Sequence, residues 1–317
     1  MKKNNINLIL MAGNAEINER DVFYKGYLTP PVQSTTTLLP QSVPFVPPPP
    51  VDIRTNAHII EGELEFEFIL EGDSSFFSVN LWGASDHLLI RINEFPYFCS
   101  VKRYQNNTYE LVNYVGTSSA VTKNEKSALM IKINSSFITV LINEIIVLTQ
   151  YFLNTGVGIG FNVYGPSPLK LLNIAVVDKK PKVFVVMQFK DSYNEIYEEV
   201  IKPICYEYGL EVTRSDDSYR NGSIIREILT ELAESTLIIA DITPDNPNVY
   251  YEVGYAHALK KEVVLLCNDA RTNLPFDLAD YRTVFYKDSI AGHSQIKIKL
   301  RKHLEEILRR DQRSQHQ

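Results

Sequence analysis

The chain has 317 residues, 44% hydrophobic and 22% charged, which is usual for a globular protein of about two domains. Its formal net charge of -6 argues against general nucleic-acid binding, because a protein that binds phosphate backbones needs clustered Lys and Arg. No stretch approaches the length of a transmembrane helix, and asparagines interrupt the first residues, MKKNNINLILMAGNA, too early for a signal peptide. We therefore expect a protein that does not enter a membrane.

The chain contains three cysteines, Cys99, Cys205 and Cys267, which are widely spaced and lie in apolar or strand-like surroundings. An odd number of distant cysteines indicates neither a disulfide framework nor a metal site. We therefore expect reduced thiols, no bound metal and a cytoplasmic protein.

In the first half of the chain, short runs alternate apolar and polar residues and are separated by Gly, Asn, Asp and Ser. The runs are GELEFEFILEG, SFFSVNLWG, HLLIRINEF, YFCSVKRY, TYELVNYVG, ALMIKINSS, FITVLINEIIVLTQYF and GVGIGFNVYG. This period of two predicts an antiparallel β-sandwich over residues 1–178. Residues 29–50 are rich in Pro and Thr, and we expect an extended segment there because Pro donates no backbone hydrogen bond.

The order of these runs, closed by PLKLLNIAVVD, resembles the concanavalin A-like (laminin-G-like) jelly roll. The resemblance implies a sandwich fold, and one hypothesis for its role is that it binds a carbohydrate. Trp82 could stack on a sugar together with the Tyr-rich strand edges. Its strand is apolar, however, and packing in the core is the commoner role of such a residue.

After Lys180, apolar strands alternate with amphipathic helices. The strands are KVFVVMQF, EVTRS, TLIIADI, EVVLLC and TVFYK, and the helices are SYNEIYEEVIKPICYEYGL, SIIREILTELAES, NVYYEVGYAHALKK and SQIKIKLRKHLEEILRR. The alternation predicts an α/β domain over residues 179–311, with a doubly wound parallel five-stranded sheet in the flavodoxin-like order 2-1-3-4-5. Residues 312–317 are expected to be a disordered tail. The short polar linker DKKPK predicts that the two halves fold independently.

In such sheets ligands bind at the carboxyl ends of the strands, between the first and third strands. We therefore expect Met187, Gln188 and Phe189, which follow the first strand, to contact a substrate. Ser223 is expected to cap a helix, whose N-terminal amides could hold a phosphate together with those of MQFKDS. No G-x-G-x-x-G motif follows the first strand, so a hydride-transferring dinucleotide enzyme is not indicated.

The helix after the third strand carries an acid, Glu252, on its inward face. If this helix is numbered from Val249, an apolar stripe at three-and-four spacing consists of Val249, Val253, Ala256 and Leu259. Glu252 lies within the arc of this stripe. The helix dipole can stabilise a carboxylate near the helix start by about 0.3–1 kcal/mol, which would be a purely structural role for Glu252. Alternatively, Glu252 is a nucleophile or base that this dipole keeps ionised.

Other residues around the third strand can likewise have either a structural role or a role in the site. Asp241 ends that strand and either belongs to the site or ties down the following loop through an Asx turn. Asn246 or Asn248 is expected to cap the helix, and Pro247 suits its first turn. We expect Asn248 and Tyr251 to contact the substrate.

The stretch ADITPDNPNVYYEVGYAHALKKEVVLL, preceded by VFVVMQF and NGSIIREILTELAEST, resembles the nucleoside 2-deoxyribosyltransferase-like family and the TIR-like domains near it. The resemblance covers about residues 181–290, and its most specific element is the acidic loop that runs into YEVG and AHA. It implies that Glu252 attacks or stabilises the anomeric carbon of a ribose as the N-glycosidic bond breaks. It also implies a second acid from the preceding helix, for which Glu227 is the nearest match, although Glu227 could equally be a solvated helix residue.

The resemblance implies a nucleotide N-glycosidase with NAD or a nucleoside monophosphate as substrate and no separate cofactor. It further implies an antiphage-type effector that depletes nucleotides, a homo-oligomer whose subunits complete each other's sites, and an activating ligand or protein at the sandwich. Two alternatives stay open. The α/β domain could bind a nucleotide as a sensor without cleaving it, or a carbohydrate-binding sandwich could be fused to a nucleotide-binding domain.

Overall fold

The computed structural model describes residues 3–4, 6–27, 48–83, 86–134, 136–152, 156–188, 190–214, 224–271, 274, 278, 281, 283–287 and 289–313. The chain divides into two compact units. The first unit consists of Met1–Ile133, Ile138–Gln150 and Val157–Asp178, and the second of Asn134–Phe137, Tyr151–Gly156 and Lys179–Gln317.

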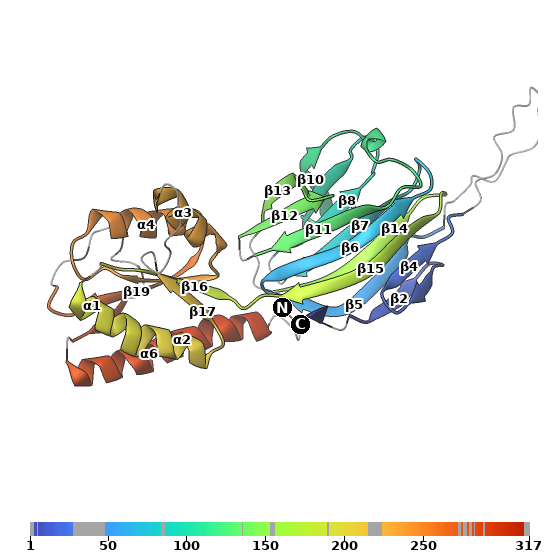
Figure 1. Cartoon of the computed structure of the whole chain (residues 1–317). Coiled ribbons are helices and arrows are strands. Elements are labelled where there is room, and N and C mark those ends of the chain that lie inside the picture. Colours follow the sequence, from blue (N-terminus) through green and yellow to red (C-terminus); the bar gives the residue numbers. More distant parts are fainter. Residues whose placement is uncertain are drawn as a thin grey trace, which may run out of the picture. The chain divides into compact units, whose positions relative to one another are not determined.

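The first unit is a sandwich of two antiparallel sheets (Figure 1). Sheet A has the order β13-β12-β11-β6-β15-β4-β3, with β1 beside β15, and sheet B has the order β10-β9-β8-β7-β14-β5-β2. The strands of sheet A are β1 (Lys3–Asn4), β3 (Glu16–Asn18), β4 (Asp21–Tyr24), β6 (Gly62–Leu70), β11 (Ser127–Ile133), β12 (Phe137–Ile142), β13 (Ile145–Tyr151) and β15 (Leu169–Asp178). Those of sheet B are β2 (Leu8–Ala12), β5 (Val51–Ile59), β7 (Phe76–Gly83), β8 (His87–Ile92), β9 (Cys99–Gln105), β10 (Thr108–Val115) and β14 (Val157–Tyr164).

Strict alternation along β6 shows why this part of the chain forms a sandwich. Its even-numbered apolar residues from Leu64 to Leu70 are buried, whereas the glutamates between them face outward. The Phe66 ring meets those of Phe77 on β7 and Phe161 on β14 edge-on, at centroid distances of 5.7 and 5.5 Å. The predicted sandwich is therefore confirmed, with its core between the inner faces of the two sheets.

Some features of the sandwich differ from the expectation. The apolar run over residues 137–152 is not one strand but the hairpin β12–β13, because Asn143 and Glu144 turn the chain with φ of 48° and 67°. The strands β1 to β5 were not predicted, since β2 is mostly exposed and β5 pairs irregularly, so that neither alternates cleanly. Of the Pro-rich segment 29–50, residues 29–47 lie outside the described part of the chain.

The described residues of the second unit form a five-stranded sheet, and every pairing in it is parallel. Its order is β17 (Glu211–Arg214), β16 (Lys182–Val186), β18 (Leu237–Asp241), β19 (Glu262–Asn268) and β20 (Thr283–Tyr286). This is the predicted order 2-1-3-4-5, with the all-buried strand β18 in the centre. The α/β prediction is confirmed.

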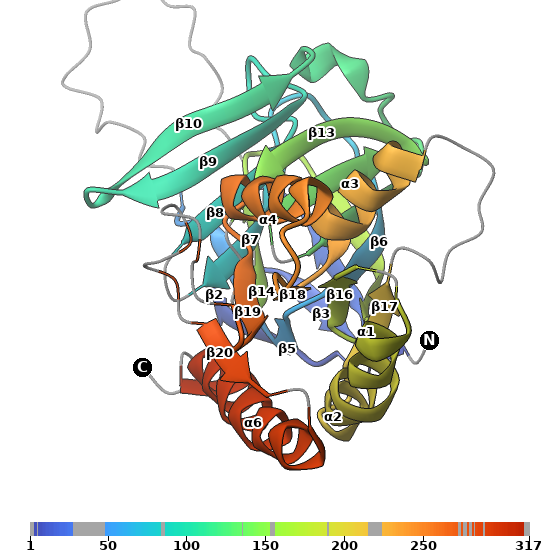
Figure 2. The same ribbon diagram turned by 90° about the vertical axis from the view of Figure 1, so that its left-hand side faces the viewer.

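Helices cover both faces of this sheet, α3 and α4 on one side and α1, α2 and α6 on the other (Figures 1 and 2). They are α1 (Asp191–Ile196), α2 (Lys202–Glu207), α3 (Ile224–Glu234), α4 (Pro247–Ala258) and α6 (Ile290–Arg313), with a π-helical turn η2 (Tyr197–Ile201) between α1 and α2. Residues 312–313, expected in a disordered tail, belong to α6, and residues 314–317 lie outside the described range. Among the described helices, none is both long and apolar enough to cross a membrane.

Candidate active site

The carboxyl edge of the parallel sheet brings several of the predicted residues to one place. Val186 at the end of β16 pairs with Ala240 on β18, so Met187 and Gln188 follow β16 at the edge where Asp241 ends β18. Met187 is buried and Gln188 is half-buried. The predicted residues Phe189 and Ser223 lie outside the described residues.

Helix α4 begins at this edge after the loop of residues 242–246. The Asn246 side chain caps the helix by accepting a hydrogen bond from the backbone N–H of Asn248 at 3.0 Å, and Pro247 is the first helical residue. Of the two expected caps, Asn246 is thus the one the structure shows. Asn248 and Tyr251, both predicted to contact substrate, are exposed to solvent.

Glu252 lies on the inward arc of α4, as predicted, since its neighbours Val249, Val253 and Ala256 are buried. The helix starts at Pro247 after the cap Asn246, and Glu252 therefore lies in the second turn. The helix dipole acts mainly on the first turn, so it gives Glu252 little of the expected stabilisation as an anion. Burial instead raises the pKa of Glu252 to about 7.

No hydrogen bond or ion pair joins Glu252 to another described residue, and burial is the sole cause of its raised pKa. A half-buried carboxyl group without a partner is costly, because neither water nor a donor fully compensates its charge. Such a group is what a site for a cationic or hydrogen-bonding ligand requires.

Asp241 is embedded in hydrogen bonds and only 1% exposed. Its Oδ1 accepts from the backbone N–H of Thr243 at 2.8 Å and from the Thr243 hydroxyl, and its Oδ2 accepts from the Tyr286 hydroxyl at 2.6 Å. The Thr243 Oγ1 also accepts from the backbone N–H of Asn268 at 2.9 Å. This is the Asx turn of the sequence analysis, extended to the ends of β19 and β20.

Burial raises the pKa of Asp241, although the bonds from Thr243 and Tyr286 act in the opposite direction. Tyr286 ends β20, and its pKa is also raised by burial and by the neighbouring Asp241. The arrangement links the ends of the third, fourth and fifth strands.

A second cluster at this edge, Asp245, Tyr250 and Arg271, was not predicted. The Asp245 Oδ1 accepts from the Tyr250 hydroxyl at 2.7 Å and from Arg271 Nη2 at 3.1 Å, and Arg271 Nη1 donates to the carbonyl of Ile242. The cluster therefore fixes the loop that leads into α4. Arg271 could have been found from its position directly after β19, where a parallel sheet presents its ligand-facing residues.

Glu227 lies in the first turn of α3 and is half-buried. Helices α3 and α4 share one apolar cluster on the sheet, which includes Leu232 and Val253. No hydrogen bond or ion pair connects Glu227 with Glu252. The structure thus places the second predicted acid on the helix that packs beside α4.

The described residues contain no group of three or more His, Cys, Asp or Glu side chains that could hold a metal ion. The carboxyl edge offers instead the Glu252 carboxyl on α4, which has no partner among the described residues, a fixed acidic loop and the polar residue Gln188. These features belong to a doubly wound α/β domain.

The nucleoside 2-deoxyribosyltransferase family model matches residues 186–298 of this chain. The match includes Met187, Gln188, Glu227, Asp241 and Glu252. Residues 186–298 therefore form a nucleoside deoxyribosyltransferase-like domain. No curated protein matches the chain.

Solved structures with carbohydrate-related names resemble the N-terminal sandwich. A carbohydrate-binding module from Bacillus subtilis is 9% identical with a TM-score of 0.39, over 54% of this chain and 94% of that one. A galectin from Caenorhabditis elegans is 15% identical with a TM-score of 0.33, over 42% and 94%. A β-1,3-1,4-glucanase (lichenase) from a mouse hindgut metagenome is 10% identical with a TM-score of 0.37, over 56% and 95%.

Proposed function

We propose that the second unit cleaves the N-glycosidic bond of a nucleotide, either NAD or a nucleoside monophosphate, and that Glu252 acts at the ribose. The observation that carries this proposal is the half-buried carboxyl group of Glu252, which has no partner among the described residues. It lies on the helix that starts at the carboxyl edge of the sheet, within the part that matches the nucleoside deoxyribosyltransferase model.

Breaking a ribosyl–base bond passes through an oxocarbenium-like state, in which positive charge develops on the sugar ring. The Glu252 carboxylate would either stabilise this charge or form an ester bond with the anomeric carbon while the C–N bond breaks. The electron pair of that bond leaves with the base, and water then takes the base's place on the sugar.

The raised pKa of Glu252 suits this role. At a pKa of about 7 roughly half of the free protein carries the carboxylate at neutral pH. A cationic group that approaches within a few ångströms lowers the pKa of a carboxyl. Both a positively charged nicotinamide ring and an oxocarbenium-like sugar would therefore increase the ionised fraction of Glu252 when it is needed.

The other predicted residues take supporting roles in this proposal. Glu227 would orient the sugar hydroxyls or assist the leaving base, and Gln188, Asn248 and Tyr251 would contact the substrate. Asp241, held by Thr243 and Tyr286, would keep the edge of the sheet in shape.

We further propose that the protein is a cytoplasmic antiphage-type effector that depletes nucleotides, with the sandwich as its sensor or assembly module. The fusion of a nucleoside-handling domain to an unrelated sandwich supports this plan. The active form would be a homo-oligomer that an activating ligand or protein controls through the sandwich.

The test is release of free base from a panel of NAD, nucleoside monophosphates and deoxynucleoside monophosphates, followed by chromatography. The proposal expects base from at least one of them and almost none with the matched variant Glu252→Gln. Nucleotide binding without base release would favour the non-catalytic sensor, and absence of both binding and release would reject either function.

A specific observation also favours the alternative that the sandwich binds a carbohydrate. Because Phe77, Val79 and Leu81 of β7 face the core, alternation puts Ser78, Asn80 and Trp82 on the outer face of sheet B. Trp82 is therefore not a core residue, contrary to the commoner role expected from its apolar strand. Its ring covers Gly160 of β14, where a Cβ would lie only 2.2 Å from Trp82 Cη2.

The outer face of sheet B combines aromatic rings with a polar row. The rings of His87, Tyr104 and Tyr109 lie within 5.0–6.0 Å of one another. The row itself is covered, since Ser78 and Asn80 are 0% and 2% exposed and bond internally, Ser78 to Asn80 at 3.0 Å and Asn80 to Asn162 at 2.5 Å. Sugars offer apolar ring faces, which match the aromatic rings.

Binding of the full chain to an oligosaccharide array tests this second candidate. Tyr104→Ala is expected to lower the affinity for a glycan ligand by about tenfold, because the substitution removes one stacking ring. Tyr206→Ala, a change at an exposed tyrosine of the second unit, is the matched control. Equal binding by the parent and Tyr104→Ala, or no binding at all, would count against a carbohydrate site on this face.

A further inference from the structure

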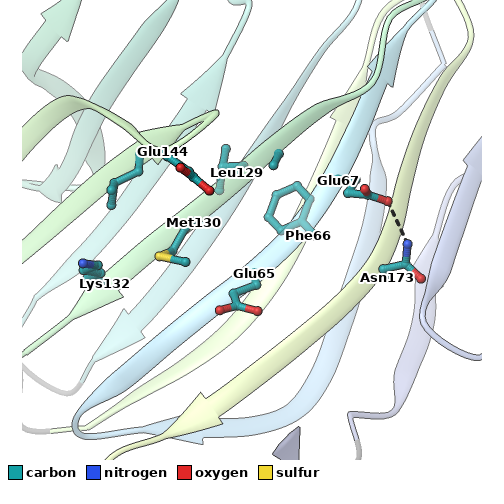
Figure 3. A pocket seen from close by; sticks show the side chains of 10 residues that line it. Glu65, Phe66, Glu67, Leu129, Met130, Lys132, Glu144 and Asn173 are labelled. Carbon is teal, nitrogen blue, oxygen red and sulfur yellow. Dashed lines mark hydrogen bonds between the residues drawn. The ribbon is translucent and has the colours of Figure 1, made fainter.

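The outer face of sheet A carries a groove of about 600 Å³ (Figure 3). This volume is in the range of sites for small molecules. Strands β6, β11, β12 and β15 and the turn after β12 line the groove, so it is built within the sandwich and lies on the sheet opposite to the aromatic face of sheet B.

The floor of the groove is an apolar strip on two neighbouring strands. Met130 of β11 pairs in register with Leu141 of β12, and Ala128 lies two residues before Met130 on the same face. Such a strip is suited to contact the methylene groups of a ligand, because apolar contact removes both surfaces from water.

Carboxylates border this strip on both sides. Glu65 and Glu67 of β6 form one wall, with Glu65 directly beside Met130 in the register of β6 and β11. Glu144, in the turn after β12, forms the other wall, and Figure 3 shows Met130 between Glu144 and Glu65. Since adjacent strands lie about 4.8 Å apart, β6 and β12 are separated by about 10 Å.

The charge of the groove favours a cation. Its lining contains three glutamates and one lysine, Lys132, and Lys126 outside the lining forms an ion pair with Glu67 at 3.0 Å, so the acidic groups still outnumber the basic ones. Hydrogen bonds from Lys126 and Asn173, at 3.0 and 2.8 Å, lower the pKa of Glu67. A ligand that complements the groove therefore has a positive charge at each end and an apolar middle.

We propose that this groove binds a linear aliphatic diamine or polyamine. One ammonium group would meet Glu65 and Glu67, the second would meet Glu144, and the methylene chain would lie on Met130 and Leu141. A monoamine satisfies one wall alone, and a basic peptide side chain likewise carries its charge at one end, so the double-ended cation fits best. This inference does not depend on the activity of the second unit.

Isothermal titration of the full chain with 1,4-diaminobutane, spermidine and 1-aminobutane tests the proposal. The two-ended amines are expected to bind at least about tenfold more tightly than 1-aminobutane, because they engage both walls. Glu144→Gln should lower the affinity for 1,4-diaminobutane by about five- to tenfold, to a value close to the affinity for 1-aminobutane. The exposed change Glu110→Gln on β10 removes the same charge outside the groove and should alter binding by less than about twofold.

Three results would overturn the proposal. They are the absence of binding heat with both two-ended amines, equal affinity for 1,4-diaminobutane and 1-aminobutane, and equal losses in Glu144→Gln and Glu110→Gln. The last would show general counter-ion attraction by an acidic protein. A thermal melt of each variant confirms that it is folded, and Glu144 lies on an exposed turn where Gln is readily accommodated.

Discussion

Asp241 and Glu252 are two acids of the same domain, separated by one loop and one helical turn, yet their surroundings are opposite. Asp241 is 1% exposed and accepts hydrogen bonds from Thr243 and Tyr286. Glu252 is half-buried, and no described residue donates to it. Both have a raised pKa because burial disfavours the charged form.

We propose that the difference separates a structural acid from a reactive one. The oxygens of Asp241 are already used to join the ends of three strands, so this residue has little capacity left for a ligand. Among the described residues, the oxygens of Glu252 have no such use, although the group is half-buried. The comparison predicts that changes at Glu252 reduce activity and that changes at Asp241 reduce stability.

The largest expected effect is the loss of activity in Glu252→Gln. Removing the charge that opposes the oxocarbenium-like state should slow base release by about 10²–10⁴-fold, because Gln keeps the shape but cannot act as an anion. The check is the rate of base release under saturating nucleotide. Glu252→Ala should be equally slow and should recover part of its rate with added formate. A Gln variant within a few-fold of the parent would remove the distinction between the two acids.

The pH dependence of the parent gives the next effect. If the carboxylate is the active form, the rate at subsaturating nucleotide, which reports the free protein, should fall about tenfold per pH unit below a pKa of about 7 and reach roughly one hundredth of its plateau at pH 5. Glu227→Gln is the control, since it should lower the plateau and leave this acid limb in place. An acid limb near pH 4.5 would mean that Glu252 does not titrate as its burial requires.

Asp241→Asn should cost stability, about 2–3 kcal/mol, because the new amide group places N–H donors where Tyr286 and Thr243 also donate. Tyr286→Phe removes one of these bonds and should cost about 1–2 kcal/mol. Chemical unfolding of the full chain, followed by the helix signal in circular dichroism, measures both. Trp82, the single tryptophan, lies in the sandwich, so its fluorescence transition should not move. A loss below about 0.5 kcal/mol in both variants would contradict a structural role.

The smallest effect is a gain of stability in Glu252→Gln. Because the folded-state pKa of Glu252 is raised from 4.5 to about 7, its contribution to stability is full below pH 4.5 and is lost as the pH rises through about 7. At pH 8 the neutral Gln should therefore stabilise the chain relative to the parent by about 1–2 kcal/mol, after allowance for partial exposure. At pH 4 the two should be nearly equal. A Gln variant that is less stable than the parent at pH 8 would show that Glu252 has a stabilising partner.

Much of this architecture follows from local sequence patterns. The change of period near Lys180 separates the sandwich from the α/β unit, and the all-apolar strand β18 has to be central in a covered parallel sheet. The inward position of Glu252 follows from three-and-four spacing alone. These features depend on neighbouring residues, which a single sequence contains in full.

The rest depends on contacts between distant segments. Tyr286 reaches Asp241 across 45 residues, because the strand order brings the ends of β18 and β20 to one edge. The sequence around Tyr286 contains no sign of that bond. Trp82 was misplaced for a related reason: its strand contains mostly apolar residues, and the contact of its ring with Gly160 of β14 is not visible in the sequence.

The central claim is that Glu252 is the reactive acid and Asp241 the structural one. It is tested most directly by base release from one nucleotide, measured side by side for Glu252→Gln and Asp241→Asn and normalised to the folded fraction of each protein. We predict that folded Asp241→Asn retains activity within about tenfold of the parent, whereas folded Glu252→Gln loses about 10²–10⁴-fold. The opposite order, an active Glu252→Gln beside an inactive but folded Asp241→Asn, would contradict the account.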